Sequence, residues 1–216
     1  SANDLSGAAY SLEKALSGKP DFLPAQALMS SVELTQGDPE KAEKRARQII
    51  QSHTRNPIGY NLLADVALAR NQPAAALEAL RRAHALQAGS GSLLRLFTLL
   101  SSDGKTLSQA FALAEQWINS HPKDVSVRKA VADAHARAGN FAAARKAYEA
   151  LLKLAPNDAE ALNNLANVLL QTKDPAAVTF AEQALAQAPN NPNVIDTAGW
   201  SNHLAGKSDR ALQLLR

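Results

Sequence analysis

The sequence predicts an all-α protein, a right-handed α-solenoid of about twelve helices arranged as tandem hairpins. Two observations carry this prediction: alanine recurs every 34 residues along most of the chain, and proline and glycine recur at set distances from these alanines. The composition agrees with it. The chain of 216 residues is 46% hydrophobic but only 5% aromatic, and its abundant alanine and leucine lose little conformational freedom in a helix.

The repeat is defined by its alanines. From Ala8 to Ala144 each lies 34 residues after the last, and one deletion near Pro175 lets the series continue to Ala211. Proline stands twelve residues after these alanines in four units, and glycine stands five residues before them in three. A fixed period of this length indicates stacked helical units. The complete series is Ala8, Ala42, Ala76, Ala110, Ala144, Ala177 and Ala211.

Residues 125–158 show how one unit is built. A first helix is predicted over 125–138, and Gly139 ends it, since glycine accepts the left-handed backbone of a helix C-terminus. A second helix is predicted over 141–154, with an apolar stripe at Ala144, Tyr148 and Leu151. Helices of this length are marginal alone, so each hairpin has to stack on its neighbours.

The same frame divides the rest of the chain. Because the first unit holds a second helix only and the last unit is incomplete, we expect residues 1–216 to be a single repeat array excised from a longer protein. The units are 1–22, 23–56, 57–90, 91–124, 125–158, 159–191 and 192–216.

This pattern resembles the tetratricopeptide repeat (TPR) family. The shared features are the 34-residue period, small residues at unit positions 8 and 20, glycine near position 15 and proline at position 32. The resemblance covers essentially the whole chain and implies a solenoid that binds a protein or an extended peptide. In that geometry Trp117, on a second helix, is expected in the core.

No residue pattern of an active site is present in the sequence. There is no cysteine, and the five histidines form no pair at metal-ligand spacing. Basic and acidic residues are interleaved, which argues against nucleic acid as a partner, and no apolar run is long enough to cross a bilayer. The prediction is therefore a non-catalytic protein without a cofactor or metal, of which this segment does not insert into a membrane. A catalytic domain outside residues 1–216 stays an open alternative.

The predicted binding surface lies in the C-terminal half, where first helices face a concave groove in the family geometry. Three asparagines stand within five residues of one predicted helix, although asparagine is a poor helix former. Their amides can exchange hydrogen bonds with the backbone of an extended peptide. The alternative is that these asparagines merely meet water, and Trp200 can either line the groove or pack between hairpins. The candidate peptide-binding residues are Lys129, Asp133, Asn163, Asn164, Asn167, Asp196, Trp200 and His203.

A narrower resemblance concerns the last units. Residues 193–200, Asn-Val-Ile-Asp-Thr-Ala-Gly-Trp, are similar to the terminal units of bacterial envelope TPR lipoproteins of PEP-CTERM and exopolysaccharide export systems. This resemblance implies a scaffold within an envelope or export assembly, and it favours the periplasm over the cytoplasm. The runner-up function is self-association, in which exposed apolar ends of the array, such as Leu12 and Leu212, join copies into an end-to-end homo-oligomer.

Overall fold

The computed structural model describes the backbone of residues 2–215 and the side chains of residues 5–215. This part of the chain contains thirteen α-helices and no β-strand. The fold is the all-α solenoid of helical hairpins that the sequence predicts, with one helix more than expected. The chain divides within α7 into two compact units, Ser1–Ala110 and Phe111–Arg216.

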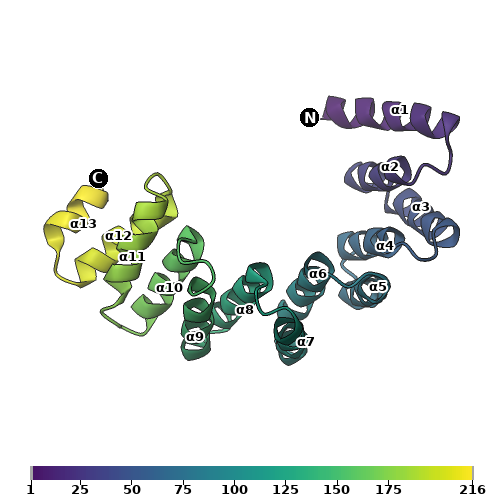
Figure 1. The fold of residues 1–216 in the computed structure, drawn as a ribbon. Coiled ribbons are helices and arrows are strands. Elements are labelled where there is room, and N and C mark those ends of the chain that lie inside the picture. The colour runs from purple at the N-terminus through teal and green to yellow at the C-terminus, as the bar shows by residue number, and fades with distance from the viewer. Residues whose placement is uncertain (1, 216) are drawn as a thin grey trace. The chain divides into compact units, whose positions relative to one another are not determined.

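The first unit is a succession of helices joined by short turns (Figure 1). Each helix from α1 to α5 packs against the next, and α2 also contacts α4, the helix two places along. The helices are α1 (Ala2–Gly18), α2 (Leu23–Thr35), α3 (Pro39–Ser52), α4 (Ile58–Ala69), α5 (Pro73–Leu86), α6 (Ser90–Ser101) and the start of α7 (Leu107–Ser120).

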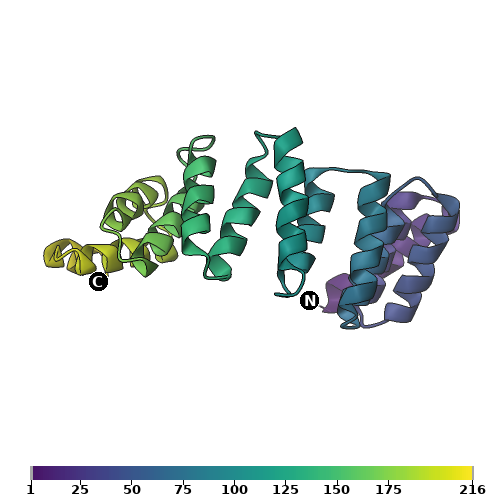
Figure 2. The same ribbon diagram turned by 90° about the horizontal axis from the view of Figure 1, so that it is seen from below.

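The second unit repeats this arrangement with antiparallel neighbours (Figure 2). Consecutive helices from α8 to α13 pack against one another, and α10 contacts both α8 and α12. The helices are α8 (Val125–Arg137), α9 (Phe141–Leu152), α10 (Ala159–Gln171), α11 (Ala177–Gln187), α12 (Pro192–Leu204) and α13 (Ser208–Leu214). The grouping of all helices into the single array 1–216, with the unit boundaries given above, stays a prediction.

Five hairpin turns share one backbone conformation. The second residue after the first helix has a positive φ in each, and the residue that follows it donates its N–H to a carbonyl five residues back, which closes the helix end. Glycine supplies this conformation in three turns, as the sequence predicts. In the other two, Asn71 and Lys173 adopt it with φ of 56°, although a side chain disfavours it. The glycines are Gly37, Gly139 and Gly206.

The alanines of the 34-residue series lie where helices cross. Ala42, Ala76, Ala110 and Ala144 are completely buried, as stacked hairpins require of a small residue that recurs with the period of the repeat. A small side chain lets two helix axes approach closely, and Ser30 uses this closeness to donate from Oγ to the carbonyl of Ala42 at 3.1 Å.

Trp117 differs from its prediction, because it is only partly buried. Its indole N–H donates to the carboxylate of Asp124 at 2.7 Å, and its ring stacks on His121 with 3.9 Å between centroids. An indole carries a donor that needs an acceptor. Asp124 is the N-cap of α8, so this contact holds Trp117 beside the helix start and not within the apolar core.

Candidate peptide-binding groove

Three helices of the second unit form the framework of the candidate site. Helices α8, α10 and α12 are the first helices of consecutive hairpins, and α10 contacts both of the others. Each begins at a side chain that accepts a backbone N–H of its own first turn, namely Asp124, Asp158 and Asn191. Such caps satisfy donors that the helix leaves unpaired, so the starts of all three helices are well defined.

Asp133 is the centre of the polar contacts between α8 and α10. Its Oδ1 accepts hydrogen bonds from the hydroxyl of Tyr148 and from the amide of Asn164, the latter at 3.2 Å. Burial and the hydrogen bond to Asp133 raise the pKa of Tyr148 far above its ordinary value, so the phenol stays a neutral donor. Within the part of the chain described here, Oδ2 of Asp133 has no hydrogen-bond partner, and it can therefore accept one from a ligand.

Lys129 is engaged within the protein. Its ammonium lies 3.4 Å from the carboxylate of Asp158 and also pairs with Glu160. Burial lowers the pKa of Lys129, but the hydrogen bond to Glu160 and the two negative charges outweigh it, so that the pKa is raised overall. The lysine therefore reaches from α8 to the start of α10 and is charged at neutral pH.

The three asparagines of α10 differ in their surroundings. Asn167 is exposed and donates to the Thr197 hydroxyl of α12 at 3.4 Å, and Asn164 is half-buried. Asn163 is only 7% exposed, and its Oδ1 is buried without a hydrogen-bond partner, while its amide nitrogen lies 3.5 Å from Oδ1 of Asn164. Because they point in different directions, Asn164 and Asn167 can meet a ligand directly, whereas Asn163 lies beneath the surface.

The remaining candidate residues lie on α12. Asp196, Trp200 and His203 are exposed, with 50% of the surface of Trp200 accessible. The centroids of the Trp200 and His203 rings are 5.3 Å apart. The sequence left open whether Trp200 packs between hairpins or faces outward. The structure has it facing outward, with its ring beside the imidazole of His203.

A groove of about 610 Å³ connects α8, α9 and α10. It brings together Asp133, Asn164 and Asn167 from the predicted set, and it does not include Lys129, Asn163 or the residues of α12. Arg137 and Tyr148 also line it and are absent from the predicted set. Arg137 stands at unit position 13, which points into the groove in the family geometry. Its position in the repeat could therefore have predicted it as a groove residue. The apolar stripe of its helix indicates that Tyr148 belongs to the core. In the structure Tyr148 also lines the groove, where its hydroxyl bonds to Asp133.

Among the described side chains, no group of three or more histidines, aspartates or glutamates is placed to hold a metal ion. Over the same residues no helix has the length and apolar character needed to cross a membrane.

The comparisons with known proteins agree with the fold. Residues 28–91 and 130–192 match the family model described as tetratricopeptide repeat. Cellulose synthase operon protein C of Komagataeibacter xylinus is 30% identical over a region that covers 70% of this chain. The chain spans only 13% of the length of that protein.

Two solved structures show the same fold. A tetratricopeptide repeat protein from Parabacteroides merdae ATCC 43184 has a TM-score of 0.67 at 16% identity, covering 98% of this chain and 84% of that one. YrrB, described as a TPR protein with an unusual peptide-binding site, has a TM-score of 0.57 at 14% identity, covering 87% of this chain and 97% of that one.

Proposed function

Because the chain belongs to the tetratricopeptide repeat family, we propose that it is a non-catalytic scaffold that binds an extended peptide in the groove lined by α8, α9 and α10. Repeats of this family serve protein–protein interaction. YrrB, a protein of the same fold, is described as having a peptide-binding site. The proposal assigns direct peptide contacts to Asp133, Asn164 and Asn167 in the groove. It assigns further contacts to Asp196, Trp200 and His203, which lie outside the groove on the neighbouring helix α12. Lys129 and Asn163 support the groove from within.

The observation that carries this proposal is the hydrogen-bonding capacity left over at Asn164 and Asn167. Each amide spends one N–H on a neighbouring helix, on Asp133 in one case and on Thr197 in the other. A carboxamide has two N–H donors and a carbonyl with two lone pairs. Each asparagine is thus held in place by the protein, and one N–H and the carbonyl oxygen can still bond to a peptide unit. Side chains that are already ordered lose less entropy on binding.

The test uses peptides selected from a random library against the wild-type protein. Their affinities are then measured by titration calorimetry for the wild type and for a double variant, Asn164→Ala with Asn167→Ala. Each lost hydrogen bond is worth ~0.5–1.5 kcal/mol, so the double variant should bind roughly five- to a hundredfold more weakly. Circular dichroism should show an unchanged helix content.

The matched control is Ser31→Ala with Asn61→Ala, on first helices of the other unit. This variant should bind the selected peptides as the wild type does. Equal affinity of the Asn164/Asn167 variant, or a larger loss in the Ser31/Asn61 variant, would show that the peptides bind elsewhere.

We further propose that this scaffold belongs to a bacterial envelope or export assembly and that it works in the periplasm. The support is the similarity to cellulose synthase operon protein C, together with the terminal-unit motif at 193–200. In the source bacterium, the Asn164/Asn167 variant should reduce exopolysaccharide secretion. Recovery of the wild-type protein only in the cytoplasmic fraction would contradict this role.

Self-association is the second candidate function, and a specific observation favours it. Large apolar side chains are exposed on the last two helices, with Leu204 at 58% and Leu212 at 54%, and Leu215 directly after them is 51% exposed. Exposed apolar surface of this kind is typical of sites of protein contact.

A further inference from the structure

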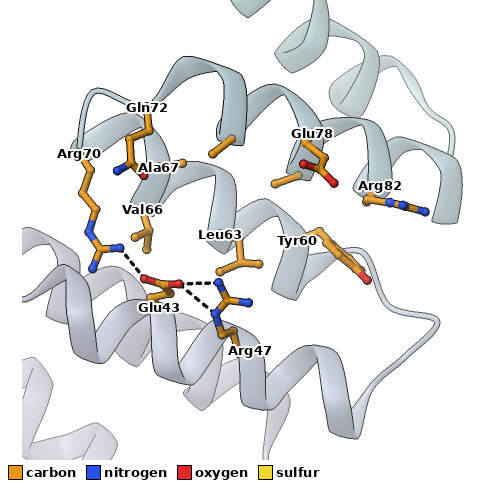
Figure 3. A pocket seen from close by; sticks show the side chains of 12 residues that line it. Glu43, Arg47, Tyr60, Leu63, Val66, Ala67, Arg70, Gln72, Glu78 and Arg82 are labelled. Atoms are coloured by element: carbon orange, nitrogen blue, oxygen red, sulfur yellow. Dashed lines mark hydrogen bonds and ion pairs between the residues drawn. The ribbon is translucent and has the colours of Figure 1, made fainter.

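A second groove lies in the first unit, on helices that the proposed peptide site does not use. It has a volume of about 630 Å³ and is lined by α3, α4 and α5, with α4 between the other two (Figure 3). Its volume falls in the range of about 300–1,000 Å³ that is usual for ligand sites. We propose that this groove binds an acidic peptide segment of a protein partner, with a carboxylate held by Arg82 and Tyr60.

The charges of the groove favour an anionic group at one end. Three arginines and two glutamates line it. Glu43 is already engaged on both oxygens, since Arg47 donates to one at 2.6 Å and 2.9 Å and Arg70 pairs with the other. The hydrogen bonds from Arg47 and then Arg70 hold the pKa of Glu43 below its ordinary value, so this carboxylate is ionised. Its negative charge is balanced by the two arginines.

Arg82 is the cation that remains. It is exposed, and neither it nor the hydroxyl of Tyr60 has a hydrogen-bond or ion-pair partner among the described residues. The two side chains come from neighbouring helices and lie at the same end of the groove (Figure 3). A guanidinium offers a planar fork of donors that matches a carboxylate, and a phenol adds a third donor. This end can therefore hold one carboxylate by several charge-assisted hydrogen bonds.

The floor of the groove favours a peptide over a small anion. It consists of aliphatic side chains, including half-buried Leu63 and the buried Val66 and Ala79. Apolar side chains of a peptide can cover this floor, which a phosphate or sulfate ion cannot do. Nucleic acid fits poorly, because Tyr60 is the one aromatic residue in the lining and the two glutamates offset two of the three arginines. The remaining positive charge can match one carboxylate but not a run of phosphates.

The test uses a fluorescein-labelled, end-capped peptide that alternates leucine and glutamate, together with a twin in which glutamine replaces glutamate. Fluorescence anisotropy should show binding of the acidic peptide and at least about tenfold weaker binding of the neutral twin. Arg82→Gln should weaken binding of the acidic peptide by about tenfold, and Tyr60→Phe by a smaller factor. Both changes affect exposed or half-exposed atoms, so the thermal unfolding midpoint should stay unchanged.

The control is Arg81→Gln, a neighbouring exposed arginine outside the groove lining that should leave binding unchanged. Three results would overturn the proposal: equal binding of both peptides, equal loss in the Arg81 variant, or displacement of the peptide by tripolyphosphate at matched charge, which would indicate a general anion site. Loss of binding in the Asn164/Asn167 variant would also overturn it, since the peptide would then occupy the groove of the second unit. The two proposals can fail separately. If the Asn164/Asn167 variant binds the selected peptides normally, the effect of Arg82→Gln on the acidic peptide still decides the proposal for the groove of the first unit.

Discussion

Small side chains decide where the helices of this protein cross. Ala144 of α9 and Ala132 of α8 are completely buried in one core cluster, and close-packed interiors of this kind leave little room for a larger side chain. At the corresponding place in the first unit, Ser30 and Ala42 are so close that a side-chain to backbone hydrogen bond joins them. The repeated alanine is therefore a packing requirement.

Replacing Ala144 by leucine should destabilise the protein by ~1–3 kcal/mol, because the extra atoms force apart two packed helices. Chemical denaturation followed by circular dichroism measures the change in the free energy of unfolding. The control is Ala142→Leu on the exposed face of the same helix, which should have little effect. Unchanged stability of the Ala144 variant would mean that this site is not a tight crossing.

A lysine in a left-handed turn is a second feature at this scale. Lys173 has φ of 56°, a conformation that costs an ordinary side chain roughly 1–2 kcal/mol. Lys173→Gly should therefore stabilise the protein by ~0.5–1 kcal/mol, since part of the gain is lost to the greater freedom of glycine in the unfolded chain. The matched control is Lys153→Gly, at a helix end with φ of −66°, which should destabilise. A thermal midpoint that does not rise in the Lys173 variant would contradict this account.

At the scale of the helices, charged networks tie neighbouring elements together. Glu182 of α11 accepts from Asn202 of α12 at 2.8 Å and from Arg210 of α13 at 3.0 Å and 2.9 Å. Asn202 is 1% exposed, so this contact also satisfies a buried amide. One carboxylate thus joins three helices at the C-terminal end of the second unit.

The pH dependence of stability should reveal this network. The hydrogen bond from Arg210, opposed by burial, lowers the pKa of Glu182 below its ordinary value of 4.5. A lowered pKa in the folded state means that the stabilisation is present above pH 4.5 and is lost as the pH falls through the lowered value. Glu182→Gln should therefore lower stability by ~0.2–1 kcal/mol at pH 7, as expected for a partly exposed pair, and the difference from wild type should vanish in acid.

Thermal melts of both proteins between pH 7 and pH 3 measure this difference. Glutamine keeps a carbonyl acceptor for Asn202, so the comparison isolates the charge. The control is Glu115→Gln, an exposed glutamate of the same unit that makes no ion pair within the described residues, for which the difference should be small at every pH. A constant difference for Glu182→Gln across the range would remove the ion pair as its cause.

At the scale of the molecule, stability comes from stacking. Most helices here have eleven to fourteen residues, too few to be stable alone in water, and each compact unit buries its apolar stripes between successive hairpins. Leu204 of α12 and Leu212 of α13 lie outside these buried stripes and form an exposed apolar surface.

We expect copies of the chain to associate through this surface. Sedimentation velocity should show a dimer at high protein concentration, and Leu204→Gln with Leu212→Gln should return the protein to a monomer without loss of helix content. Leu28→Gln with Leu68→Gln changes two other exposed leucines and should leave the dimer intact. A wild-type protein that stays monomeric at every concentration would contradict self-association.

The candidate site was predictable in part. The unit positions of Asp133, Asn164 and Asn167 were enough to bring them to one groove, because residues at the same place in successive repeats lie side by side when hairpins stack. The burial of Asn163 was not predictable, since the tilt of a helix decides which of two adjacent residues faces outward. Whether these residues bind a peptide stays a prediction.

The sequence by itself determined the helices, their glycine turns and the buried alanines, because each depends on neighbours within a few residues or on an exact period. Only the tertiary structure decided which polar groups meet. Lys129 and Glu160 are 31 residues apart, as are Asp133 and Asn164, and Asn167 and Thr197 are 30 apart. Hydrogen bonds require donor and acceptor to approach within a few tenths of an ångström of a set distance. A repeat period brings such residues near each other, but the crossing of the helices and the side-chain rotamers decide whether the bond forms.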